Sequence, residues 1–235
     1  LVDLARSSDL VFTGDFTFEG WFKPDTVSGN QGLWVLGAHD LAGGFEVYTK
    51  GKKVGVKNVS GEQFNSADLL SEGQWYHLAL VRSGSAITLY LNGTSIDSYT
   101  DSSDYGSNNR TYFLIGASYG SGGTSDYFNG SQSNIRVLNG TALYTSSFRP
   151  PTTPLTNITN TKLLYCNNAS VTAGTVLPAS LTNQGCVAST DSPFDDPAAF
   201  VFGANEDQQA IKCGSYVGNA SDDGPEIVLG FEPQY

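Results

Sequence analysis

The sequence predicts an all-β sandwich over roughly residues 1–151, and three observations support this prediction. Hydrophobic and polar residues alternate with a period of two in this region, while helical periodicity is nearly absent. Short apolar runs are separated by turn signals roughly every ten residues, which is typical of sandwiches and jelly rolls. Aromatic residues make up 12% of the chain and charged residues 15%, which suits a packed core and excludes a disordered chain.

Four strands are expected in the first part of the chain. Residues 16–22 carry the clearest alternation, and Pro24 lies in the turn that ends this strand. Residues 33–36 form a short apolar run that is typical of a buried strand. Residues 44–48 and 52–56 then predict a hairpin.

The later strands are predicted by the same alternation and by stronger turn signals. Asn92-Gly93 is the strongest short hairpin signal in the chain, because these residues adopt the backbone angles that a two-residue hairpin turn needs. A long segment rich in Gly, Ser, Tyr and Asp separates the last two strands. The expected strands are residues 75–82, 87–91, 96–99, 112–117 and 134–138.

Three runs within these strands resemble, in order and spacing, the concanavalin A-like, laminin G-like lectin domain. They are Phe16-Thr17-Phe18-Glu19-Gly20-Trp21-Phe22, Trp75-Tyr76-His77-Leu78-Ala79-Leu80-Val81-Arg82 and Leu89-Tyr90-Leu91-Asn92-Gly93. The resemblance implies that the sandwich is a concanavalin A-like jelly roll.

The continuation of the chain looks more specifically like the version of this domain in virion proteins of bacteriophages, especially marine and cyanobacterial ones. The residues are Phe128-Asn129-Gly130, Ile135-Arg136-Val137, Ala142-Leu143-Tyr144 and Phe148-Arg149-Pro150-Pro151. This resemblance implies a structural protein of a phage particle, in a tail fibre, a spike or a head decoration.

The composition changes after residue 151, so we expect three segments. The first, residues 1–151, is the sandwich, and residues 152–197 form a Thr-, Asn- and Pro-rich extension, packed on it, with a short strand at 162–166. Residues 198–235 resemble the beginning of a second β-rich domain that follows in the phage proteins. Because the sequence holds no methionine, we expect the chain to be a piece of a longer protein.

Charge and hydropathy exclude two classes of partner. The net charge is -11 and the 12 Lys and Arg residues are scattered, so no basic stripe is available to contact phosphates and nucleic acid is not expected. The longest apolar stretch lies near residues 78–81, far short of the roughly 18 residues of a membrane-spanning helix. No membrane insertion is therefore expected.

The three cysteines are Cys166, Cys186 and Cys213, which cannot all pair within the chain. None has the C-x-x-C spacing of a zinc or redox site. We interpret them as small apolar residues or free thiols, and a disulfide between Cys166 and Cys186 is the alternative.

The sequence predicts a protein that is not an enzyme. Retaining glucanases of this fold place two carboxylates about 5 Å apart on alternate positions of one strand, and the chain has no such cluster. The run Gly116-Ala117-Ser118-Tyr119-Gly120 matches the G-x-S-x-G pattern, but no helix follows to present the serine. His77 is expected to make a structural hydrogen bond inside a strand. A glycoside hydrolase would instead depend on Glu19 or Glu46.

Residues 101–127 form the most suggestive surface for ligand recognition. Tyrosine offers rigid amphipathic area, while Asn, Ser and Asp give adaptable hydrogen bonds, a mixture that recognition loops use. The candidate glycan-binding residues are Tyr105, Asn108, Asn109, Tyr112, Tyr119, Asp126 and Tyr127. The alternatives are an ordinary long loop and a loop packed against a neighbouring subunit.

Calcium is the one cofactor that the sequence suggests. Asp126 and Asn129 could supply hard oxygen ligands, as could Asp101 and Asp104. No stretch has EF-hand spacing, and solvated loop acids are the alternative.

Two functions from different classes remain open. The first is a structural virion protein on the phage surface, which contacts other virion proteins and host-surface glycans and assembles as a homo-oligomer, a trimer if the resemblance holds. The second is an extracellular carbohydrate-binding module or adhesin.

Overall fold

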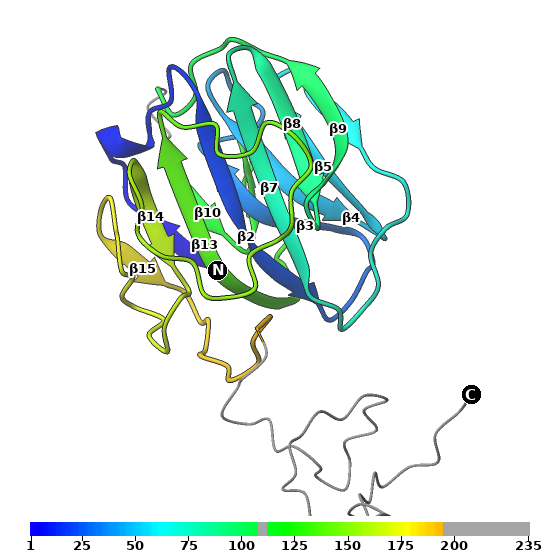
Figure 1. The fold of residues 1–235 in the computed structure, drawn as a ribbon, viewed down its shortest axis with the longest axis vertical. Coiled ribbons are helices and arrows are strands. Elements are labelled where there is room, and N and C mark those ends of the chain that lie inside the picture. The colour runs from blue at the N-terminus through cyan, green and yellow to red at the C-terminus, as the bar shows by residue number, and fades with distance from the viewer. Residues whose placement is uncertain (108–111, 195–235) are drawn as a thin grey trace, which may run out of the picture. The chain divides into compact units, whose positions relative to one another are not determined.

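The computed structural model describes residues 1–107 and 112–194, in which two antiparallel β-sheets pack face to face (Figure 1). The predicted all-β sandwich is confirmed. The helical element in these residues is a single 3-10 turn at Ser8–Leu10, where the Ser7 hydroxyl accepts a hydrogen bond from the Asp9 N–H. None of the described residues forms a helix long and apolar enough to cross a membrane.

The predicted second β domain, residues 198–235, lies outside the described residues, as does Cys213. The division at residue 151 stays a prediction.

The seven-stranded sheet has the order β15-β1-β10-β3-β4-β5-β6. Its strands in this order are Leu181–Asn183, Val2–Leu4, Phe113–Ile115, Asn30–Leu36, Phe45–Lys50, Lys53–Asn58 and Gly61–Asn65. The six-stranded sheet has the order β14-β13-β2-β7-β8-β9. Its strands are Thr161–Tyr165, Gly130–Asn139, Phe16–Pro24, Tyr76–Ser83, Ala86–Leu91 and Thr94–Thr100. A separate small hairpin joins β11, Ser118–Gly120, to β12, Gly123–Ser125.

The long strand β2 differs from its prediction at one end. It runs on through Pro24, which pairs with Gly130 of β13 instead of ending the strand in a turn. Proline cannot donate to a ladder, and here it occupies the last position of the strand. The short strands β1, β6, β11, β12 and β15 had no sequence signal, because three to five residues are too few to show a period.

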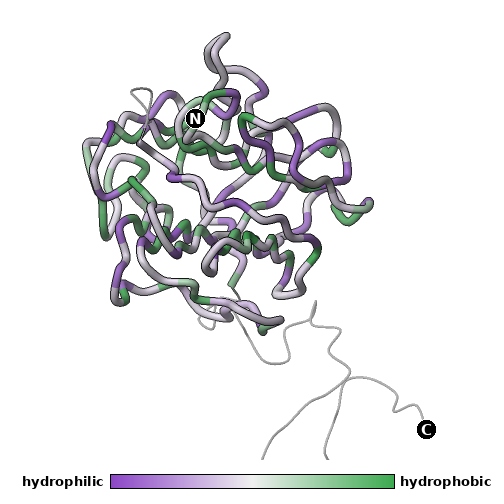
Figure 2. The backbone as a smooth tube through the Cα atoms, turned by 90° about the horizontal axis from the view of Figure 1, so that it is seen from above, coloured by the Kyte–Doolittle hydropathy of each residue, from purple (hydrophilic) through white to green (hydrophobic). Residues whose placement is uncertain are grey.

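The core lies between the two sheets and is rich in aromatic rings. Phe16 and Phe18 of β2 face Phe45 of β4, with ring centroids 6.2 and 5.1 Å apart. Gly20 lies on the same face of β2, where a Cβ would come within 3.0 Å of the Trp34 ring, so the missing side chain makes room for the indole. Figure 2 shows hydrophobic and hydrophilic stretches interspersed along the backbone of the sandwich.

A long connection between β13 and β14 crosses the outer surface of the six-stranded sheet (Figure 1). We call its first part, residues 141–148, the strap. Three of its side chains pack on outward-facing residues of β7 and β8: Ala142, Tyr144 and Phe148. The strap therefore buries the face of a sheet that would otherwise be exposed to water.

The first and the last strand of the described residues lie side by side in the seven-stranded sheet. Strands β1 and β15 are antiparallel neighbours, with Val2 opposite Asn183. The Gln184 N–H donates to the Leu1 carbonyl at 3.0 Å, which continues the pairing past the ends of both strands.

A candidate ligand-binding face on the seven-stranded sheet

The outer face of the seven-stranded sheet carries charged and aromatic side chains. On β4, Phe45 and Val47 point into the core, so Glu46 and Tyr48 point outward. On β5, Val54 and Val56 point inward and Lys57 points outward. This alternation places polar groups of neighbouring strands beside one another.

The β11–β12 hairpin lies across this face because Gly32 of β3 has no side chain. A Cβ at Gly32 would lie 2.2 Å from the backbone of Ala117 and Ser118. The Gly32 N–H donates to the Asp126 carbonyl at 2.8 Å, which fixes the far end of the hairpin. The close approach brings Ser118 and Tyr119 next to β4.

Glu46 is the centre of the polar groups beneath this hairpin. Its carboxylate accepts a hydrogen bond from the Ser118 hydroxyl at 2.6 Å and lies 3.0 Å from His39 Nδ1 and 3.3 Å from Lys57 Nζ. Only 1% of the Glu46 side chain is exposed, so these contacts replace the water that a buried carboxylate has lost.

Ser118 does not form a nucleophile elbow. Its hydroxyl donates directly to a carboxylate, and the chain continues into a hairpin instead of a helix.

His39 is held with one ring nitrogen toward the protein. Nδ1 lies 2.8 Å from the Tyr119 carbonyl oxygen as well as near Glu46, and both of these neighbours are acceptors. Nδ1 therefore carries a proton that it donates toward these acceptors. The side chain is 21% exposed, so a ligand can reach the ring.

Aromatic and carboxylate groups adjoin this histidine at the surface. The rings of Tyr112 and Tyr119 meet edge to face with centroids 6.2 Å apart, and Tyr112 is 41% exposed. Asp40 accepts hydrogen bonds from the Ser121 N–H at 2.8 and 2.9 Å and from its hydroxyl, and the hydroxyl contact is the main cause of the lowered pKa of Asp40. We call these residues the Tyr119 face: His39, Asp40, Tyr112, Tyr119 and Ser121.

The face continues toward β5 and β6. Lys57 Nζ lies 5.1 Å above the ring of Tyr48, which stands opposite Gly55 in the strand register. Burial, aided by the charges of Glu62 and Glu46, raises the pKa of Tyr48, so the phenol stays protonated.

The structure brings together two of the residues predicted to bind a glycan, Tyr112 and Tyr119. Asp126 and Tyr127 are exposed but follow β12, at the opposite end of the hairpin from its turn. Asn108 and Asn109 lie outside the described residues.

Tyr105 does not belong to any surface, although the sequence suggested it. Its side chain is 2% exposed and packs against Phe45 and Phe16, while its hydroxyl donates to Asp101 at 2.6 Å. The physical reason is its bridge to Phe12, which turns the ring into the core. A ring in this position cannot stack on a sugar.

Residues His39, Asp40 and Glu46 were not among the predicted binding residues. They meet Ser118, Tyr119 and Ser121 only because the hairpin crosses β3, which brings together residues more than 70 positions apart. The one sequence feature that could have indicated this crossing is Gly32, because a glycine within a strand often marks the close approach of another backbone.

Asp126 and Asn129 stay a prediction as calcium ligands. In residues 1–107 and 112–194, no group of three or more His, Cys, Asp or Glu side chains could hold a metal ion. Calcium is also bound by amide and backbone carbonyl oxygens, which such a group does not include.

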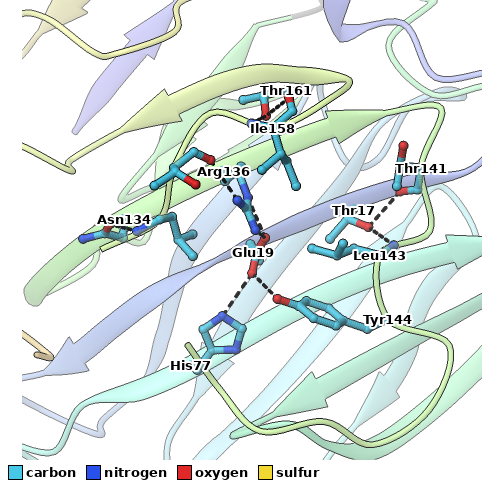
Figure 3. Close-up of polar contacts among 12 residues, drawn as sticks. Thr17, Glu19, His77, Asn134, Arg136, Thr141, Leu143, Tyr144, Ile158 and Thr161 are labelled. Atoms are coloured by element: carbon cyan, nitrogen blue, oxygen red, sulfur yellow. Dashed lines mark hydrogen bonds and ion pairs between the residues drawn. The ribbon is translucent and has the colours of Figure 1, made fainter. Parts of the chain in front are cut away.

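A second polar cluster lies on the outer face of the other sheet, beneath the strap (Figure 3). Glu19 Oε1 accepts from Arg136 Nη2 at 2.6 Å and Nε at 2.8 Å, and Oε2 accepts from the Tyr144 hydroxyl at 2.8 Å. His77 Nε2 lies 3.3 Å from Oε2, without hydrogen-bond alignment. Glu19 and His77 are fully buried.

Thr17 joins this cluster to the strap through two hydrogen bonds. Its hydroxyl donates to the Thr141 carbonyl and accepts from the Leu143 N–H, each at 2.9 Å (Figure 3). The buried cluster therefore holds the strap on the sheet, and the strap closes it to any substrate. His77 lies inside β7, as the sequence predicted, but neither of its ring nitrogens makes the predicted hydrogen bond.

Comparison with known proteins gives a family match over most of the sandwich. The family described as the concanavalin A-like lectin/glucanases superfamily, in its Laminin_G_3 form, matches residues 2–144. No curated protein matches the chain significantly.

Solved structures share the fold at low sequence identity. A candidate carbohydrate-binding protein from Bacteroides ovatus is 18% identical with a TM-score of 0.53, and the match covers 70% of this chain and 49% of that protein. The chain thus spans about half the length of this relative.

Two further structures are similar over a smaller part of the chain. The CBM40 of the Ruminococcus gnavus IT-sialidase, bound to α2,3-sialyllactose, is 15% identical with a TM-score of 0.48 and coverage of 57% and 80%. A SAP-like pentraxin from Limulus polyphemus is 17% identical with a TM-score of 0.46 and coverage of 58% and 68%.

Proposed function

The chain belongs to the concanavalin A-like lectin/glucanases superfamily, and we propose that it is a non-enzymatic protein that binds carbohydrate at the Tyr119 face. The observation that carries the proposal is the pair Tyr112 and Tyr119 beside the partly exposed ring of His39 and the carboxylate of Asp40. A sugar ring offers an apolar face to an aromatic side chain and hydroxyl groups to fixed acceptors.

The contacts of the two buried glutamates, Glu19 and Glu46, support a binding function and not catalysis. A glycosidase needs one carboxylate free to attack or to deliver a proton. Glu46 is occupied by Ser118, His39 and Lys57, and Glu19 is sealed beneath the strap by Arg136. Neither carboxylate is available to a glycosidic bond.

The finer proposal is that this domain belongs to a structural protein of a phage particle, where it contacts host-surface glycans. It is supported by the resemblance of residues 128–151 to phage virion proteins. The net charge of -11 suits a protein displayed in many copies, because like charges limit nonspecific association.

The carbohydrate proposal is tested by applying the full chain to a glycan array and measuring the affinity for the best ligand. The Tyr112→Ala variant should lose affinity, whereas Ile158→Ala should not, because Ile158 lies in the loop that precedes β14 on the other sheet. A glycan that binds both variants as well as it binds the parent chain would refute this location, and no binding at all would refute the function.

The virion proposal needs a separate measurement. Antibody labelling of phage particles that encode the chain should find it on the particle surface. A chain that is secreted and binds glycans as a free monomer would instead be a carbohydrate-binding module or adhesin.

A further inference from the structure

A cleft of about 580 Å³ is lined by none of the residues of the Tyr119 face. Its walls come from the start of β1, the first half of β13 and the two segments 165–171 and 185–191. Both cysteines of the described region, Cys166 and Cys186, line this cleft, and both thiols are free in the structure.

The two cysteines belong to different sheets. Cys166 directly follows β14 of the six-stranded sheet, and Cys186 lies three residues after β15 of the seven-stranded sheet. Both side chains are partly buried and pack on the same hydrophobic core. A covalent bond between them would therefore join the two layers of the sandwich at one end.

The backbone holds each cysteine in place. The Cys166 carbonyl accepts hydrogen bonds from the Asn134 N–H at 2.9 Å and the Ser133 hydroxyl at 3.4 Å. The Asn183 side chain accepts from the Cys186 N–H and donates to its carbonyl, both at 2.8 Å. The backbone at both cysteines is thus ordered before the bond forms.

We propose that Cys166 and Cys186 form a disulfide bond in an oxidising environment, which links the two sheets across the cleft. Oxidation has two steps when glutathione disulfide is the oxidant. A protein thiolate first attacks one sulfur of the oxidant, releases one glutathione thiolate and leaves a mixed disulfide. The second protein thiolate then attacks the protein sulfur of the mixed disulfide and releases the other glutathione. The two cysteines lose two electrons and two protons, and the oxidant is reduced to two glutathione molecules.

Burial, with a contribution from the neighbouring Cys186, raises the pKa of Cys166 to about 12. Because the thiolate is the nucleophile, the raised pKa slows any step in which Cys166 attacks near neutral pH. Either cysteine can form the mixed disulfide, and the other cysteine then resolves it.

The experiment uses the full chain with Cys213→Ser, so that only this pair is titrated. The protein is incubated with glutathione disulfide without denaturant, and its free thiols are counted with a thiol-reactive chromogen. We expect both thiols to disappear, the mass to fall by two hydrogens and the protein to stay monomeric on a non-reducing gel. Proteolytic mapping should recover a peptide that contains Cys166 joined to Cys186.

Two matched variants separate this outcome from general thiol reactivity. In Cys166→Ser and in Cys186→Ser, the glutathione adduct on the remaining cysteine should accumulate, because no second thiol is present to resolve it. The melting temperature should rise on oxidation of the pair and stay unchanged in both variants. The proposal is overturned if both thiols persist in the folded pair, if the mixed disulfide remains, or if disulfide-linked dimers form instead.

Discussion

Replacing Glu19 with glutamine removes a negative charge from a fully buried ionic cluster while keeping the shape of the side chain. Arg136 then keeps its positive charge in the same place, with one amide oxygen to accept from it. The new NH₂ group also faces donors, since both Arg136 and the Tyr144 hydroxyl donate to the native carboxylate.

The expected loss of stability is large for a change of one atom. Removing one partner of a buried ion pair costs about 3–5 kcal/mol, because the other charge is left uncompensated. The amide oxygen keeps one hydrogen bond, so we expect a loss in the free energy of unfolding of about 3 kcal/mol, at the lower end of this range.

The measurement is urea denaturation of the parent and of Glu19→Gln, followed by circular dichroism. Glu62→Gln is the matched control, because Glu62 pairs with Lys50 at 2.9 Å but both side chains are nearly half exposed. An exposed pair contributes about 0–1 kcal/mol. If Glu19→Gln costs no more than the control, the strap is not held by this charge.

The same variant should change the response to acid. Burial by itself would raise the pKa of Glu19, but the contact with His77, the charge of Arg136 and the Tyr144 hydrogen bond outweigh it and hold the pKa below 4.5. A carboxyl group with a lowered folded pKa stabilises the protein above its unfolded pKa, and this stabilisation is lost as the pH falls through the folded pKa. Glu19→Gln should therefore lose part of the acid-side slope below about pH 4.5.

Three further predictions concern the hairpin, the strap and the ligand. Gly32→Ala should displace the hairpin, since the new Cβ would lie 2.2 Å from backbone atoms, and should cost about 1–3 kcal/mol in urea denaturation together with glycan affinity. Gly122→Ala, with open space around its Cβ, is the control, and equal effects of the two would contradict the account. Thr17→Val should lose about 1–3 kcal/mol and speed proteolysis within residues 141–148, because it removes both hydrogen bonds to the strap. Unchanged cleavage there would show that the strap is held by packing alone. Tyr119→Ala should weaken glycan binding about tenfold by calorimetry, as expected for losing an aromatic contact of about 1.4 kcal/mol, while Tyr119→Phe should keep most of the affinity. Similar losses for both would mean that the hydroxyl, and not the ring, makes the contact.

The sequence predicted those parts of the fold that depend on neighbouring residues. The alternation in β2, β7 and β8 and the Asn92-Gly93 turn are local signals, and the structure confirms strands on both sides of that turn. The strands β1 and β15 have three residues each, which is too short for a periodic pattern, and they pair with each other across almost the whole described sequence.

The candidate site was only partly predictable, for a related reason. Composition marks Tyr112, Tyr119 and Tyr105 equally as recognition residues, yet the strand bridge to Phe12 buries the last of them. The contact of His39 with Glu46 and Tyr119 requires the hairpin to cross the sheet, which residue types alone do not reveal.

The neighbouring strands β1 and β15 determine how the sandwich would carry mechanical load. Val2 pairs with Asn183, and the Gln184 N–H bonds to the Leu1 carbonyl, so the chain arrives and departs at the same point of the sheet. Tension applied between these two points pulls the antiparallel strands apart one hydrogen bond after another. The force then acts perpendicular to the two strands, along their hydrogen bonds, and does not slide one sheet over the other. Force applied at these two points would therefore act first on the pairing of β1 with β15.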